Sequence, residues 1–181
     1  MAYAEEIIDD LSGSHGGNPA AGRPRAGWAL ISDGVMGGVS SGAMMAEIVA
    51  GRAALCLRGT VSLENNGGFL QIARDLAQGG GAVDASIWDG IQLDVIGNGE
   101  IYNLHLRTAD LLRPWASYRQ SFVAPAQWTR VHLPFSGFAP HRTSAPLRKT
   151  RLRRIGVVAI GRAFAAEIAI SDLRFYRASH T

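Results

Sequence analysis

The sequence predicts an all-β protein, folded as a single-domain antiparallel jelly-roll β-sandwich. Three observations lead to this prediction. About ten short segments alternate apolar and polar residues, with turn residues between them at the spacing typical of a sandwich. The 181 residues include 22 glycines against 7 prolines, which indicates many tight turns. No segment with a helical period is long enough to cover a parallel sheet.

The N-terminal segment differs from the rest of the chain. Residues 5–12 predict a short amphipathic helix with two isoleucines and Leu11 on one side. Residues 12–25 are rich in Gly, Ser, Pro, Asn and His, which predicts a flexible lead-in loop. We therefore expect two parts, an N-terminal helix and lead-in over residues 1–26 and the sandwich domain over residues 27–177.

The first strands of the domain follow from a period of two. Residues 43–49 and 52–58 flank Ala50-Gly51, which predicts a tight hairpin turn. Residues 68–74 predict the next strand. Turn residues separate all three segments, as antiparallel strands require.

A second hairpin is predicted in the middle of the chain. Residues 91–95 and 102–106 both alternate apolar and polar side chains. Asn98-Gly99 lies between them and is the strongest short hairpin signal in the sequence.

The remaining strands complete the sandwich. Alternation predicts strands over residues 118–123, 128–135 and 167–176. Residues 155–160 are continuously apolar, as in a strand that is buried on both faces. In the last strand the apolar face switches at Ser171-Asp172, which predicts a β-bulge.

Composition and charge argue against several classes of protein. Hydrophobic residues make up 47% and charged residues 18%, as in a soluble globular protein rather than a disordered one. No run approaches the roughly 20 apolar residues of a membrane span. The acidic N-terminus lacks the basic region of a secretory signal, so we expect a bacterial, cytoplasmic protein. Cys56 is the single cysteine, which excludes an internal disulfide.

A nucleic-acid partner is not expected either. The net charge is +3, but the only basic cluster, over residues 142–154, is interrupted by Leu152 and Ile155. This pattern is typical of a strand with one solvated face rather than of a continuous basic surface.

Two glycine-rich stretches, residues 28–42 and 64–69, carry the candidate site. Each places amide, carboxylate or hydroxyl side chains among glycines and beside large apolar residues. Asp33 either caps neighbouring N–H groups or binds a ligand hydroxyl, a cation or an arginine of a partner. Asn65 and Asn66 either form a turn or present paired amides to sugar hydroxyls or a peptide backbone.

Two residues outside these stretches are candidates as well. Arg107 ends a predicted strand, and a buried arginine needs a partner. Asp33 or Glu64 is the expected partner, and such a pair would join the glycine stretches to the sheet. Trp115 lies in a predicted loop and is the best candidate for an exposed aromatic platform, although most tryptophans are largely buried.

No reaction is indicated. Residues 38–42 match the pattern G-x-S-x-G, but a nucleophile elbow needs a strand before its serine and a helix after it. Here glycines precede Ser40 and a predicted strand follows, so a structural turn is expected. The five histidines lack the neighbours of a metal triad, and neither a cofactor nor a transition metal is expected. A structural calcium ion stays open as an alternative.

A set of residues in a defined order links the chain to a known family. They are Trp28, Asp33–Ser40, Glu64–Phe69, Asp89–Ile91, Gly97–Gly99, Tyr102, Leu104, Arg107, Tyr118, Trp128 and Leu133–Phe135. On these residues the chain resembles the complex I intermediate-associated protein family, named for an assembly factor of NADH:ubiquinone oxidoreductase. The resemblance implies a galactose-binding-like jelly roll, a fold shared with several carbohydrate-binding modules. It also implies a role in respiratory complex I assembly, at least for mitochondrial members.

We therefore expect a non-catalytic binding or assembly module, with a chaperone-like role and a protein partner such as a subunit or assembly protein of complex I. The alternative is a carbohydrate-binding module of galactose-binding-like type. The expected binding residues are Asp33, Gly34, Met36, Gly38, Ser40, Asn65, Asn66, Gly68, Phe69, Arg107, Trp115 and Tyr118.

Overall fold

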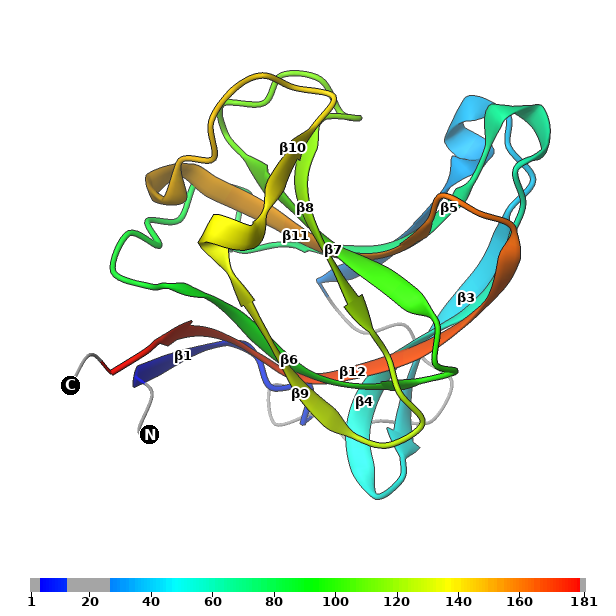
Figure 1. The fold of residues 1–181 in the computed structure, drawn as a ribbon, viewed down its shortest axis with the longest axis horizontal. Coiled ribbons are helices and arrows are strands. Elements are labelled where there is room, and N and C mark those ends of the chain that lie inside the picture. Colours follow the sequence, from blue (N-terminus) through cyan, green and yellow to red (C-terminus); the bar gives the residue numbers. More distant parts are fainter. Residues whose placement is uncertain (1–3, 13–26, 180–181) are drawn as a thin grey trace.

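The computed structural model describes residues 4–12 and 27–179, and these residues form two antiparallel sheets packed face to face (Figure 1). One sheet has the order β3-β4-β12-β6-β9, and β1 also pairs with β12. The other has the order β10-β8-β7-β11-β5-β2. The predicted all-β sandwich is therefore confirmed.

The strands of the first sheet are β1 (Ala4–Asp9), β3 (Ser41–Val49), β4 (Arg52–Val61), β6 (Gly90–Gly97), β9 (Thr129–Pro134) and β12 (Phe164–Arg177). Those of the second are β2 (Trp28–Ser32), β5 (Phe69–Asp75), β7 (Ile101–Thr108), β8 (Ser117–Val123), β10 (Ala139–His141) and β11 (Leu152–Ile160). Within the described residues, the 3₁₀ turns between them are η1 (Asp33–Met36), η2 (Glu64–Asn66), η3 (Phe135–Gly137) and η4 (Lys149–Arg151).

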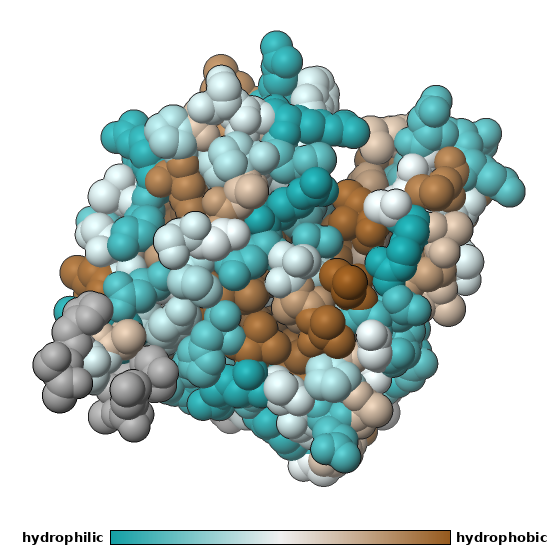
Figure 2. Space-filling view, in the orientation of Figure 1, coloured by the Kyte–Doolittle hydropathy of each residue, from teal (hydrophilic) through white to brown (hydrophobic). Residues whose placement is uncertain are grey.

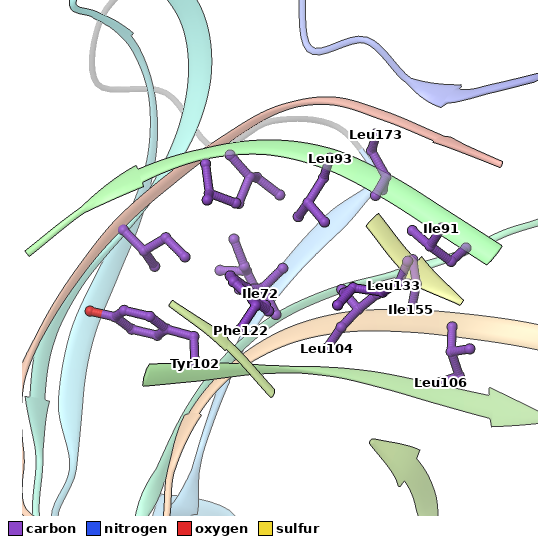
Figure 3. Close-up of a cluster of buried hydrophobic side chains, with 14 of the residues drawn as sticks. Ile72, Ile91, Leu93, Tyr102, Leu104, Leu106, Phe122, Leu133, Ile155 and Leu173 are labelled. Atoms are coloured by element: carbon purple, nitrogen blue, oxygen red, sulfur yellow. The ribbon is translucent and has the colours of Figure 1, made fainter. Parts of the chain in front are cut away.

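The core lies between the two sheets (Figure 3). Ile91 and Leu93 of β6 point into it from one sheet, and Leu104 of β7 and Ile155 of β11 from the other. Along each strand every second side chain enters the core, because successive residues of a strand point to opposite faces. Strand β11 lies between β7 and β5, and its residues 155–159 are buried throughout, as predicted.

Two sequence predictions of local structure are confirmed. Strands β3 and β4 form a hairpin whose turn residues Ala50 and Gly51 have φ angles of 45° and 81°. The predicted bulge is present in β12, where the pairing with β6 shifts between Ser171 and Arg174 and Asp172 has a φ of 50°.

The predicted N-terminal helix is wrong. The first described residues form β1, which pairs with the C-terminal part of β12. A helix of eight residues is marginal in water because nucleation is costly. One edge of β12 is open to β1 there, since the pairing of β12 with β4 extends only from Phe164 to Ile170. The expected lead-in loop lies almost wholly outside the described residues.

The predicted hairpin at Asn98-Gly99 is also wrong. Gly99 has a positive φ of 81°, but β6 and β7 belong to different sheets, so the turn carries the chain across the sandwich. The Asn98 amide donates to Ala165 O at 2.9 Å, and its oxygen accepts from the Tyr102 hydroxyl at 2.7 Å. The same turn signal can therefore connect two sheets when the following strand buries its apolar face in the core.

The Ala50-Gly51 turn generates a prediction about stability. Positive φ at both central residues defines a type I′ turn, which favours Asn-Gly because alanine is strained there. The substitution Ala50→Asn should raise the free energy of unfolding by about 0.5–1 kcal/mol, measured by urea denaturation. Ala163→Asn is the control, since Ala163 is exposed and has no positive φ. An equal effect at both sites would contradict the strain at Ala50.

Candidate functional site

The two glycine-rich stretches meet at one end of the sandwich. The first connects β2 to β3 through η1, and the second connects β4 to β5 through η2. Both therefore cross from one sheet to the other. They lie side by side at the upper right of Figure 1, and the Asp33 Oδ2 atom joins them by accepting from the backbone N–H groups of Gly68 at 2.6 Å and Phe69 at 3.3 Å.

Asp33 also binds the far end of its own loop. Its Oδ1 atom accepts from the Ser40 N–H at 3.0 Å, and Oδ2 accepts from the Ser40 hydroxyl at 2.5 Å. The Ser40 hydroxyl in turn accepts from the Ser62 N–H at 2.9 Å. Asp33 is 0% exposed, so both of its oxygens satisfy groups of the protein itself. Of the two predicted roles of Asp33, the structure supports the capping role.

Two glycines make this approach feasible. A Cβ atom on Gly38 would lie 2.4 Å from Asp33 Cγ, and one on Gly67 would lie 2.5 Å from Asp33 Oδ2. Real Cβ atoms do not approach other atoms so closely, so any larger residue would push the carboxylate away. The glycines therefore leave room for the buried side chain, in addition to forming the turns.

The hydrogen bonds also control the charge of Asp33. Burial, the largest single influence, would raise the pKa of this carboxyl group, because a charged group is less stable away from water. The bonds from the Ser40 hydroxyl and from the Gly68, Ser40 and Phe69 amides outweigh burial and hold the pKa of Asp33 below its ordinary value. Asp33 is therefore ionised at neutral pH.

The outer side of the two loops is apolar. Val35 is 78% exposed and Met36 54% exposed, and both belong to η1. Val39 and Leu63 are also exposed. We call these four residues the loop surface. Of the four, the sequence predicted only Met36 as a binding residue. The other three are hydrophobic residues within or directly beside the glycine stretches, which was the signal available in the sequence.

The other predicted residues of the loops divide into exposed and buried ones. Asn65 and Asn66 are exposed, with φ angles of 55° and 58°, so both form the left-handed turn that asparagine tolerates. Gly34 is also exposed, and its N–H donates to the Ser32 hydroxyl at 3.2 Å. Gly68 and Ser40 are buried beneath them. The Ser40 hydroxyl is thus occupied by structural hydrogen bonds, as expected for a turn rather than a nucleophile elbow.

The expected ion pair of Arg107 with Asp33 or Glu64 is wrong. The Arg107 Nη1 atom donates to the carbonyl oxygens of Arg113 at 2.8 Å, Pro114 at 3.0 Å and Ala116 at 2.5 Å. Arg107 therefore fixes the β7–β8 loop. Register explains why it cannot reach the glycine stretches. Arg107 pairs with Arg154 of β11, and Arg154 pairs with Asp75 of β5. Phe69 lies six residues from Asp75 along β5, or about 20 Å away.

Tyr118 and Trp115 lie near Arg107 in the chain and differ from each other in burial. Tyr118 was predicted on the binding surface, but it is 0% exposed and its hydroxyl donates to the carbonyl oxygens of Ala145 and Pro146. It faces the core because its partner in the register is the buried Leu106. Trp115 is half exposed, as expected, and the Arg113 guanidinium lies 5.9 Å from its ring centre. The residues predicted to form one surface therefore lie in two regions, at the two glycine-rich loops and at the β7–β8 loop with β8.

Neither a cluster of metal ligands nor a membrane-spanning helix is found among the described residues. Over residues 4–12 and 27–179, no three His, Cys, Asp or Glu side chains lie together as metal ligands would. Within the same ranges, no helix has the length and apolar character to cross a membrane.

The comparison with protein families identifies the chain. The family model for complex I intermediate-associated protein 30 matches residues 20–169, and the chain belongs to this family. None of the curated proteins compared with the chain matched it.

Solved structures share the fold. The family 11 carbohydrate-binding module of the cellulosomal cellulase Lic26A-Cel5E of Clostridium thermocellum has a TM-score of 0.72 at 14% identity, over 97% of this chain and 95% of that one. A family 11 module from the same organism, in complex with a β-1,3-1,4-mixed-linked tetrasaccharide, has a TM-score of 0.71 at 14% identity, over 97% and 96%. A family 30 carbohydrate-binding module has a TM-score of 0.59 at 12% identity, over 76% and 75%. At such identities the likeness shows a galactose-binding-like jelly roll and nothing about ligands.

The charge of Asp33 leads to a prediction about acid stability. A carboxyl group whose pKa is lower in the folded state stabilises that state above its unfolded pKa, and this contribution is lost as the pH falls through the folded pKa. Asp33→Asn should lower the free energy of unfolding at pH 7 by about 2–4 kcal/mol, because an amide N–H₂ group would face backbone donors. Between about pH 5 and pH 2.5 the variant should lose less stability than the wild type.

The measurement is urea denaturation across this pH range. Asp75→Asn is the control, since Asp75 lies at the other end of β5 and approaches Arg154 only at 3.9 Å. It should keep the acid dependence of the wild type. Parallel pH curves for the wild type and Asp33→Asn would contradict the ionised, hydrogen-bonded state of Asp33.

Proposed function

We propose that this protein is a non-catalytic binding module that docks a partner protein on the loop surface, and that it acts in the assembly of respiratory complex I. The observation that carries the proposal is the exposure of Val35 and Met36 on a turn whose loop is hydrogen-bonded from below by the buried Asp33 carboxylate. Membership of the complex I intermediate-associated protein 30 family supports the assembly role.

Rigidity supports the use of this surface for binding. An interface gains affinity when its side chains are already ordered, because less conformational entropy is lost on binding. The Asp33 carboxylate orders both loops at once, since it accepts from Ser40 at one end of η1 and from Gly68 beyond η2. The apolar side chains are therefore presented on a fixed backbone.

The exposure of these apolar side chains also supports a role in binding. Single exposed hydrophobic residues are common on protein surfaces, but contiguous ones are typical of interaction sites. Figure 2 shows brown and tan atoms among hydrophilic ones at the upper right, where the two loops lie. Burial of Val35 and Met36 by a partner would remove this apolar area from water.

Substitutions on the loop surface test the proposal. Val35→Asp and Met36→Asp should reduce the recovery of complex I subunits or assembly proteins in a pull-down from a bacterium with this complex, by at least about tenfold. Their thermal midpoints should stay close to that of the wild type, because both side chains are exposed. The matched control is Ile87→Asp, which changes an apolar residue outside the two loops whose exposed fraction lies between those of Met36 and Val35. Recovery of the same proteins by all three variants would refute the proposed surface.

A carbohydrate is the second candidate ligand, and Trp115 is the observation that favours it. Its half-exposed ring lies on a loop that Arg107 holds through three carbonyl oxygens, so the aromatic surface is ordered before any ligand arrives. The family 11 module named above was solved with a tetrasaccharide, which makes sugars the natural compounds to screen.

A glycan array separates the two candidates. If the second is correct, the wild type should bind a defined glycan, and Trp115→Ala should lose at least about tenfold in affinity, since stacking on an aromatic ring supplies much of such binding. Leu112→Ala is the control, because Leu112 is exposed in the same loop and has no aromatic face. Unchanged binding in Trp115→Ala, or no binding by the wild type, would remove this candidate.

A further inference from the structure

The outer face of the first sheet carries a small apolar cluster that is separate from the main core. Ala54, Cys56 and Ala169 are buried there, with Val49, Ile96 and Trp128 packed against them. Trp128 lies across this face, because its indole N–H donates to Val49 O at 3.0 Å. The Arg52 guanidinium lies 4.9 Å from the ring centre of Trp128. Trp128 and Arg52 therefore cover one side of the cluster.

A cavity of about 170 Å³ stays open beside this cover. Its lining residues are Val49, Cys56, Arg58, Ile96, Gly97, Ala126, Glu167, Ile168 and Ala169. In the register Ala169 lies opposite Cys56 on one side and opposite Ile96 on the other, so the three side chains share one face of the sheet. Cys56 and Ala169 are small, so the surface of the sheet is lower at these two residues, and they form the floor of the cavity.

The size and lining of the cavity suit a compact apolar group. A closed cavity of about 150 Å³ lined by aliphatic side chains is large enough for benzene. The Cys56 thiol adds no charge to the floor at neutral pH, because burial, followed by the nearby Glu47, raises its pKa to about 11. An aromatic or branched aliphatic group would thus contact neutral, mostly apolar atoms.

A negative charge is in excess at one edge of the cavity, where Arg58 and Glu167 are lining residues and Glu47, outside the lining, is paired with Arg58. Arg58 donates to both carboxylate oxygens of Glu47, at 2.7 and 2.9 Å, so its charge is already paired. Glu167 approaches the Arg58 Nε atom only at 3.7 Å, and its side chain is 63% exposed. The three groups together carry two negative charges and one positive charge. The rim can therefore accept one further cation at Glu167.

We propose that this cavity binds a small amphipathic cation, an arylalkyl- or alkylammonium compound, with the apolar group on the floor formed by Cys56 and Ala169 and the ammonium group at Glu167. This site lies apart from the loop surface and does not depend on the function proposed for it.

A titration monitored by NMR tests the proposal on the full ¹⁵N-labelled chain. The ligands are 2-phenylethylammonium, the neutral 2-phenylethanol and the anionic phenylacetate, which share one apolar group. The ammonium compound should cause saturable shifts at the amides of Gly97, Glu167 and Ala169, with a dissociation constant of about 1 mM, as expected for so small a ligand. The alcohol should bind about threefold more weakly, and phenylacetate most weakly.

Variants assign the two parts of the site. Ala169→Leu fills the cavity and should abolish the shifts. If Ala169→Leu does not fold, Ala126→Phe takes its place in the test. It covers the rim from an exposed position and should also abolish the shifts. Glu167→Gln should reduce the affinity for the ammonium compound to that for the alcohol. Glu64→Gln, which removes an equal charge at η2, should leave both affinities unchanged.

Three results would contradict the proposal. Absence of saturable shifts with the wild type would overturn the proposal. So would equal affinities for the ammonium compound and phenylacetate, or undiminished binding in both cavity-filling variants. None of these outcomes bears on the loop surface, whose test uses different residues and a protein partner.

Discussion

The buried Asp33 carboxylate is the constraint on which this end of the sandwich depends. Two chain segments cross there from one sheet to the other, and backbone N–H groups at such crossings have no strand to pair with. An unsatisfied buried N–H group destabilises a fold, so an acceptor must be supplied from elsewhere. One carboxylate supplies it to Ser40, Gly68 and Phe69 together. The glycines at positions 38 and 67 leave the space that this side chain requires.

The exposed features follow from the buried ones. Because Asp33 satisfies the inner side of both loops, their outer side is free to carry apolar residues without disturbing the fold. The β7–β8 loop follows the same principle, since the partly buried Arg107 donates to its carbonyl oxygens and leaves Trp115 half exposed. In both places a charged side chain orders a loop from within. The charged groups therefore position candidate binding surfaces instead of forming them.

The sequence predicted the architecture well and the site in part. Alternation of apolar residues predicted most strands, because one face of each strand must enter the core. The N-terminal strand was missed, since β1 forms only by pairing with β12, which is distant in the sequence. The turn at Asn98-Gly99 was assigned to a hairpin because turn residues do not reveal which sheet follows. The capping role of Asp33 was one of the two roles predicted for it, because an aspartate before a glycine typically caps a turn. The partners of Arg107 depend on register, and register cannot be read from local sequence.

The account depends on Asp33 holding backbone amides from both loops in the folded state. Native-state hydrogen exchange of the unmodified protein measures this directly. The amides of Ser40 and Gly68 should exchange as slowly as the core amide of Leu104, and far more slowly than that of the exposed Gly81. If Ser40 and Gly68 instead exchange as fast as Gly81, the two loops are not joined through the carboxylate, and the proposed rigidity of the loop surface is lost with it.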